Sequence, residues 1–149
     1  MKDPRERLSK LLNEPIDPND QDWEWIISDS ERIWDYIRFY NIGHLSAYER
    51  RLLMEMMLQA VNDDKLEFGF MPRFWLKVKA LLETNFSVHK QTIEYWANIG
   101  EFAPSYYSWA IAKELRKIYW EKSVKKCMLR ICEPPTFYRT SGLSLRTSN

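Results

Sequence analysis

Helical spacing of apolar residues is the feature that most constrains how this chain folds. The clearest stretch follows Ser46 and Glu49, which are spaced as a helix capping box. The apolar residues after this start recur as one face of a helix: Leu52, Leu53, Met56, Met57, Ala60 and Val61. We expect the helix to end at Asn62, Asp63 and Asp64, whose short polar side chains favour turns. The pattern thus predicts a long amphipathic helix near the middle of the chain.

Further helix signals lie on both sides of this stretch. Asp3 as N-cap and Pro4 at the first helical position predict a first helix, which Pro15 ends. Pro72 opens another helix, and Asn85 or Ser87 marks a break or the cap of the helix that follows. Three apolar stripes accompany these signals. One lies before the capping box: Ile33, Trp34, Ile37 and Tyr40, with an end at Gly43. Two lie after it: Trp75, Val78, Leu81 and Leu82, and then Ile93 and Trp96, with an end at Gly100.

Two segments leave their structure open. Residues 22–27, Asp-Trp-Glu-Trp-Ile-Ile, form either a short helix or an extended acidic linker, with a new cap at residues 28–30. Pro104 and Ser105 begin the longest predicted helix, which is either one helix of about 25 residues or two helices with a bend. Pro134 and Pro135 forbid its continuation. Residues 133–149 show no period and are predicted to be an irregular tail.

The whole pattern predicts an all-α protein: a compact bundle of about five to seven helices. The chain has 149 residues, the ordinary size of one domain, and only 4 glycines, which suits helices better than a sheet rich in hairpins. Alternation of apolar and polar residues is confined to 65–70, and one isolated strand would have no partner. We therefore expect a single helical domain over 1–132 and a tail over 133–149.

The sequence predicts a cytoplasmic protein without a membrane segment. Residues 1–7 have no apolar stretch of the kind that a signal peptide requires. No window approaches 18 uncharged apolar residues, the length that spans a bilayer. Cys127 and Cys132, the two cysteines, are then expected to be free thiols in a reducing compartment.

Catalytic and metal-binding patterns are lacking, so we expect no enzyme activity, no cofactor and no metal. Cys127 and Cys132 are spaced too widely for a zinc pair, and on one helix they would lie on different faces. The start of a calcium loop at Asp17 fails at its sixth and twelfth positions. A pairing of Cys127 with His89 as nucleophile and base has no support beyond the presence of both residues.

Charge is distributed unevenly along the chain. Residues 1–75 hold 10 basic and 15 acidic side chains, and residues 76–149 hold 12 basic and 6 acidic ones. Between Glu14 and Asp35 eight carboxylates face Arg32 alone, and Trp23, Trp25 and Trp34 lie among them. Such a segment suits capture of a basic protein, because charge orients the encounter and aromatic anchors hold the complex. The predicted contact residues are Asp20, Asp22, Trp23, Glu24, Trp25, Asp29, Glu31 and Asp35.

Three other interpretations of the charge pattern remain open. The tryptophans of the acidic segment would instead belong to the core while its carboxylates face water. The basic segment 113–130, with seven cations and the aromatic residues Tyr119 and Trp120, would bind nucleic acid in a regulatory protein. Against that alternative, the pI of about 7.7 is low for a dedicated nucleic-acid domain. Finally, the acidic segment would pack against the basic helix and neutralise it within the fold.

One segment resembles a known class of proteins. Its residues are Trp75, Val78, Leu81, Leu82, Asn85, His89, Thr92, Ile93, Tyr95 and Trp96, after an earlier Leu-Leu-Met-Glu at 52–55. This arrangement resembles small helical immunity proteins of contact-dependent and polymorphic toxin systems. The resemblance covers about a third of the chain, and it implies a non-enzymatic cytoplasmic protein that binds and neutralises a cognate toxin. A basic toxin such as a nuclease would suit the acidic segment as its partner.

Overall fold

The computed structural model describes residues 3–15, 22–42, 44–100 and 109–131, and for Trp23, Glu24 and residues 125–131 it describes the backbone alone. Within these ranges the chain is helical and contains no strand, which confirms the predicted all-α bundle. The elements are α1 (Pro4–Leu12), α2 (Trp23–Ile26), the 3-10 turn η1 (Ser30–Arg32), α3 (Ile33–Asn41), α4 (Ala47–Phe68), α5 (Trp75–Thr84), α6 (Phe86–Trp96) and α7 (Ala112–Ile131). The tail predicted for 133–149 lies outside the described residues.

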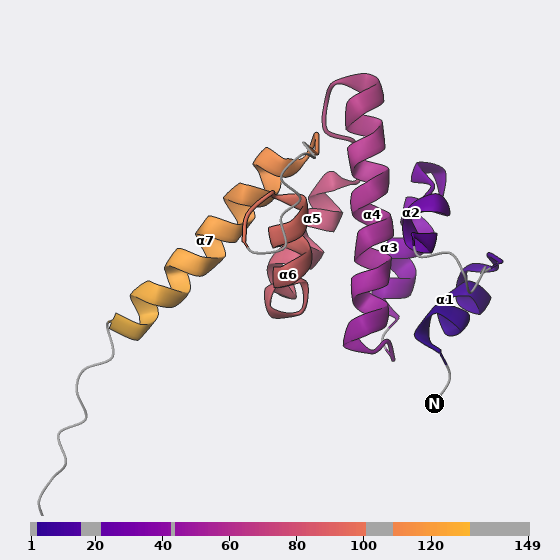
Figure 1. The fold of residues 1–149 in the computed structure, drawn as a ribbon, viewed down its shortest axis with the longest axis horizontal. Helices are drawn as coiled ribbons and strands as arrows, with labels where there is room; N and C mark the ends of the chain where they lie inside the picture. The colour runs from indigo at the N-terminus through magenta and orange to yellow at the C-terminus, as the bar shows by residue number, and fades with distance from the viewer. Residues whose placement is uncertain (1–2, 16–21, 43, 101–108, 132–149) are drawn as a thin grey trace, which may run out of the picture.

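Helix α4 is the central element of the bundle. Its start is the predicted capping box, in which the Ser46 hydroxyl accepts the Glu49 N–H and the Glu49 carboxylate accepts the Ser46 N–H. Apolar residues are buried around most of its circumference: Leu52, Leu53, Met54, Met56, Met57, Leu58, Ala60 and Val61. A helix that is apolar on all sides requires neighbours on all sides. Accordingly, α1, α2 and α3 lie on one side of α4, and α5, α6 and α7 lie on the other (Figure 1).

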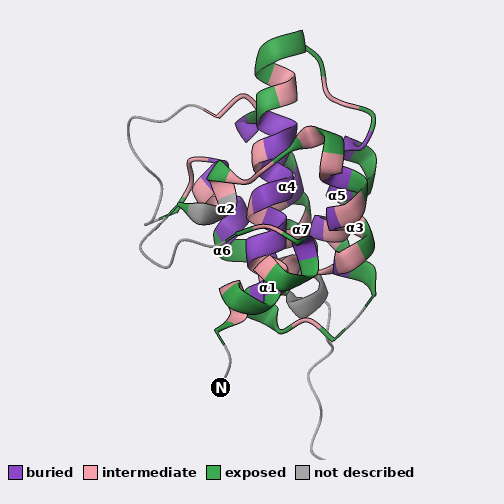
Figure 2. Cartoon of the chain, turned by 90° about the vertical axis from the view of Figure 1, so that its right-hand side faces the viewer, coloured by how far each residue is buried: buried purple, intermediate pink, exposed green. Residues whose placement is uncertain are grey.

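The predicted end of α4 at residues 62–64 is wrong. The helix continues to Phe68 and ends at Gly69, which adopts the left-handed conformation with φ of 76°. Asn62 is buried, and its side-chain oxygen accepts the Ala110 N–H at 2.8 Å, so it joins α4 to the start of α7 instead of ending a helix. The last turns of α4 extend beyond the core, where exposed residues predominate (Figure 2).

The N-terminal helices follow their predicted caps, with one change of face. The Asp3 carboxylate accepts the Arg5 N–H, and α1 ends before Asn13, which is left-handed, two residues before Pro15. In α3 the buried face consists of Ile33, Tyr36 and Tyr40. Trp34, which was predicted on that face, is 55% exposed. Hence the covered face of α3 is rotated from the predicted one, with Tyr36 donating to the Ile27 carbonyl oxygen and Tyr40 hydrogen-bonded to His89 of α6.

The C-terminal half contains two short helices and one long one. Trp75, Val78 and Leu82 are buried on α5, and the chain breaks at Asn85 before α6, as predicted. The described part of the last predicted helix is a single element, α7, which begins at Ala112 after the non-helical residues 109–111. Its predicted start at Pro104–Ser105 lies outside the described residues. At 20 residues α7 is shorter than α4, which has 22.

Candidate functional site

The open question about residues 22–27 is resolved in favour of a short helix, and α2 places Trp25 against the core. The Trp25 ring lies 6.1 Å from the Trp96 ring and 6.1 Å from the Trp109 ring, measured between centroids. Trp96 is fully buried on α6, and its own ring lies 4.4 Å from that of Trp109. Trp25 is therefore a half-buried core residue as well as a predicted contact residue.

The acidic residues of this segment have different surroundings. Asp22 and Glu31 are exposed, as is Asp29, whose carboxylate accepts the Glu31 N–H at 2.8 Å and caps η1. Asp35 is half-buried and pairs with Arg38 at 3.1 Å. Of the other predicted contact residues, Asp20 lies outside the described residues, and Trp23 and Glu24 are described only as backbone positions in α2.

The one cation of residues 22–35 is turned toward α1. Arg32 forms an ion pair with Glu14 and also donates to the Leu12 carbonyl oxygen at 2.5 Å. Its positive charge is thus used to hold η1 against the end of α1. Nearby, Trp34 and Ile26 are 55% and 66% exposed. Within residues 22–35 the exposed apolar side chains thus lie close in sequence to exposed carboxylates. We call the set Asp22, Ile26, Asp29, Glu31 and Trp34 the acidic surface.

The acidic surface and the basic helix do not face each other. In Figure 1, α7 lies beyond α6, on the opposite side of α4 from α1 and α3. Two side-chain hydrogen bonds from the first turns of α7 go to α6 and the residue that follows it. Arg116 donates to the Ala97 carbonyl oxygen at 2.7 Å, and Tyr119 donates to Glu94 at 2.9 Å. Within the described residues, internal neutralisation therefore does not explain the charge asymmetry.

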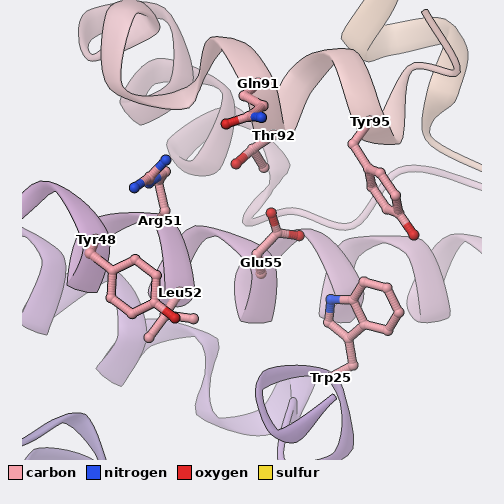
Figure 3. Close-up of a pocket in the computed structure, with 8 residues that line it drawn as sticks. All are labelled: Trp25, Tyr48, Arg51, Leu52, Glu55, Gln91, Thr92 and Tyr95. Carbon is pink, nitrogen blue, oxygen red and sulfur yellow. The ribbon is translucent and has the colours of Figure 1, made fainter. Parts of the chain in front are cut away.

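A second candidate site, which the sequence did not suggest, is a cleft between α2, α4 and α6. The cleft has a volume of about 530 Å³. Helix α4 supplies its floor, α6 one wall and α2 one end (Figure 3). Its lining residues are Trp25, Tyr48, Arg51, Leu52, Glu55, Gln91, Thr92 and Tyr95.

The charged residues of this cleft are one helical turn apart on α4. The Arg51 guanidinium lies 5.7 Å from the centroid of the Tyr48 ring. The Glu55 carboxylate accepts a hydrogen bond from the Trp96 indole N–H, which fixes its position. A signal for this site was present in the sequence, because residues 48, 51, 52 and 55 fall on one helix face and alternate aromatic, charged and apolar character.

The buried histidine is part of the core. His89 on α6 is fully buried, and its Nε2 lies 2.6 Å from the Tyr40 hydroxyl, while its Nδ1 has no hydrogen-bond partner. Burial, followed by the positive charges of Arg50 and Arg51, lowers the pKa of His89 to about 4. Burial also raises the pKa of Tyr40. His89 is therefore neutral at pH 7.

The two histidines do not converge on a common cleft. His44 is exposed in the connection between α3 and α4, where its carbonyl oxygen accepts a hydrogen bond from Arg7 at 2.8 Å. Cys127 belongs to α7, with its side chain outside the description, and Cys132 lies outside the described residues. The described residues contain no cluster of three or more side chains able to ligate a metal. None of the helices searched in the described part is long and apolar enough to cross a bilayer.

Comparisons with known proteins return nothing that matches. No protein-family model, no curated protein and no solved structure is significantly similar to this chain. Function has to be inferred from the residues and their arrangement alone.

Proposed function

We propose that this protein is a non-enzymatic binding module that captures a basic protein partner through the acidic surface. In its most specific form, the module is an immunity-type protein that neutralises a cognate toxin, such as a basic nuclease, in the cytoplasm. Its contacts would be made by residues of α2, η1 and the start of α3.

The observation that carries this proposal is the exposure of Trp34 among carboxylates. A tryptophan that is 55% exposed leaves a large apolar area in water, and a protein partner would cover it. Glu31, which is exposed, lies three residues before it, and Asp29 is exposed at the cap of η1. The charge would speed and orient the encounter, and the indole would then be desolvated in the complex.

The structure alters which residues we expect to anchor the partner. Trp25 packs against Trp96 and Trp109, so its removal would damage the core before it affected a partner. Trp34 and Ile26 have the exposure that an anchor requires. Asp35 contributes less charge to a partner than Glu31 does, because it is already paired with Arg38.

A photo-crosslinking amino acid at position 34 of the full chain tests the proposal in the native host. The matched control carries it at Leu76, which is 73% exposed on α5 and belongs to the other side of the bundle. We expect one basic protein to crosslink at position 34 and not at position 76. Crosslinking of the same protein at position 76 alone would place the interface elsewhere and contradict the proposal.

The captured partner then allows the charge and the anchor to be tested separately. Glu31→Lys with Asp22→Lys should lower the association rate about tenfold at low salt and flatten its salt dependence. Trp34→Ala should raise the dissociation rate at least about tenfold. Glu67→Lys and Leu76→Ala change an exposed charge and an exposed apolar residue elsewhere, and should change neither rate. Unchanged rates in the first two variants would exclude this surface.

Nucleic-acid binding through α7 is the second candidate. The observation in its favour is Trp120, which is 57% exposed on the same helix as the exposed cations Lys113, Arg116 and Lys117. An exposed indole stacks on bases while neighbouring cations contact phosphates. Fluorescence anisotropy with random single-stranded and duplex oligonucleotides at about 50 mM salt tests this function, because phosphate contacts are strongest at low salt. Absence of binding there would exclude it.

A further inference from the structure

The cleft between α2, α4 and α6 has the size and composition of a small-molecule site. Its volume of about 530 Å³ lies within the range of roughly 300–1,000 Å³ that is common for such sites. Aromatic side chains from three helices line it: Trp25 from α2, Tyr48 from α4 and Tyr95 from α6. Polar groups are interspersed among these rings, and Figure 3 shows them pointing into the same space.

Arg51 is the cation of the cleft, and it has no carboxylate partner among the described residues. By contrast, Arg7, Arg32 and Arg38 each form an ion pair on the surface of α1, η1 or α3. Arg51 is half-buried, and its guanidinium is placed by contact with the Tyr48 ring. Gln91 and Thr92 lie across from it on α6 (Figure 3). A planar guanidinium beside an amide and a hydroxyl is suited to bind a carboxylate.

Glu55 places a negative charge one turn farther along the same floor. Side chains four residues apart on a helix have Cβ atoms about 5–6 Å apart, so the two opposite charges are neighbours. The hydrogen bond from Trp96 keeps the Glu55 carboxylate directed into the cleft, near Trp25 and Tyr95. A simple anion near Arg51 would be repelled by Glu55, and a simple cation near Glu55 would be repelled by Arg51. A ligand that carries an ammonium group and a carboxylate on the same carbon atom would complement both charges.

The aromatic end of the cleft determines the rest of the ligand. Trp25 and Tyr95 lie with their rings 6.2 Å apart between centroids, and together they offer an apolar edge beside Glu55. The Trp25 indole N–H is buried and has no hydrogen-bond partner, so it supplies an unused donor at this end. A flat apolar group would cover the rings and gain their dispersion energy.

We propose that this cleft binds a zwitterionic amino-acid-type ligand with an aromatic side group, with its carboxylate on Arg51 and its ammonium group on Glu55. The site is independent of the acidic surface as a protein-docking face, since the ligand contacts the floor and walls of the cleft. Its test therefore needs no protein partner.

Phenylalanine and its two single-charge analogues provide the experiment. Phenylalanine, 3-phenylpropionate and 2-phenylethylamine are each titrated into the full ¹⁵N-labelled chain, and the indole N–H of Trp25 is followed by NMR after assignment with Trp25→Phe. We expect phenylalanine to shift this signal with a dissociation constant at least about fivefold lower than either analogue, as partly solvated charge pairs would give. No shift at about 10 mM phenylalanine, or equal affinity for all three, would overturn the proposal.

Two variants test which residue binds the carboxylate of the ligand and which binds its ammonium group. Arg51→Gln removes the partner of the carboxylate, so it should lower the affinity for phenylalanine to that of 2-phenylethylamine. Glu55→Gln removes the partner of the ammonium group, so it should lower the affinity for phenylalanine to that of 3-phenylpropionate. Arg73→Gln, which removes an exposed cation outside the cleft, should leave all three affinities unchanged. Glu55→Gln keeps an oxygen for the Trp96 indole, and thermal melts check that both variants remain folded. Because Arg51 forms no ion pair with another described residue, its replacement by Gln should leave the protein folded. Unchanged phenylalanine affinity in Arg51→Gln therefore refutes the proposal even where Glu55→Gln fails to fold.

Discussion

Replacement of His89 by Gln should make the protein less sensitive to mild acid, although it removes a core residue. His89 is fully buried, and its pKa is lowered from 6.5 to about 4, mainly by burial and then by Arg50 and Arg51. Between these two pH values the unfolded chain binds a proton that the folded chain does not bind. The free energy of unfolding therefore falls as the pH falls from about 6.5 to about 4, and the contribution is fully present above that window.

The size of this effect follows from the pKa difference. A lowering of the pKa from 6.5 to about 4 can change the free energy of unfolding by at most about 3 kcal/mol. About 2 kcal/mol of this change falls between pH 7 and pH 4.5. Gln can still bond to the Tyr40 hydroxyl but does not titrate. The wild type should thus lose about 2 kcal/mol more than His89→Gln over this interval, equivalent to about 4–8 °C in melting temperature.

Urea unfolding followed by tryptophan fluorescence at pH 7 and pH 4.5 measures this difference. Carboxylates that titrate in the same interval are common to both proteins and cancel when the two pH effects are subtracted. His44→Gln removes the other histidine, which is exposed, and serves as the control for loss of a surface imidazole. A difference below about 0.5 kcal/mol between the wild type and His89→Gln would refute the reasoning that burial keeps His89 neutral.

Three further stability predictions follow from helix ends and packing, each measured by urea unfolding at pH 7. Ser46→Ala should cost about 1 kcal/mol, because it removes the acceptor for the Glu49 N–H, and Ser46→Thr should recover most of the loss. Gly69→Ala should cost about 1–2 kcal/mol from backbone conformation alone, since φ is 76° and no atom lies within 4 Å of the added Cβ; a gain in stability would contradict this cause. Leu53→Ala should cost about 2–5 kcal/mol, because Leu53 is fully buried on α4; a loss below about 1 kcal/mol would mean that the centre of the bundle is loosely packed.

Local signals were sufficient to identify where several helices begin. The Ser46–Glu49 capping box and the Asp3–Pro4 start depend on groups three residues apart or fewer, so sequence order alone brings them together. The chain also breaks at Asn85, where the side chain does not cap α6 and instead donates to the Leu81 carbonyl oxygen. Helix ends were less predictable, because a polar side chain inside a helix can bond to a group that is distant in sequence. Here Asn62 accepts the Ala110 N–H, and residues 62–64 stay helical.

The candidate sites were predictable only in part, for a related reason. The charge asymmetry and the tryptophans of the acidic segment are properties of the sequence, and they led to the surface that contains Trp34. Which tryptophan is exposed was not predictable, because Trp25 packs against Tyr95, Trp96 and Trp109, all 70 or more positions away in the chain. The cleft requires α2, α4 and α6 to be neighbours, which no single stretch specifies.

The sequence by itself determined that the protein is a bundle of helices with charge of opposite sign in its two halves, since helical period, caps and composition are local quantities. Tertiary structure decided which face of each helix is covered. That choice turned Trp34 outward and Tyr36 inward on α3, and it enclosed Arg51 and Glu55, already neighbours on one face of α4, in a cleft. A helical period repeats the same stripe whichever neighbour covers it, so only the packing of the other helices assigns a residue to core, cleft or surface.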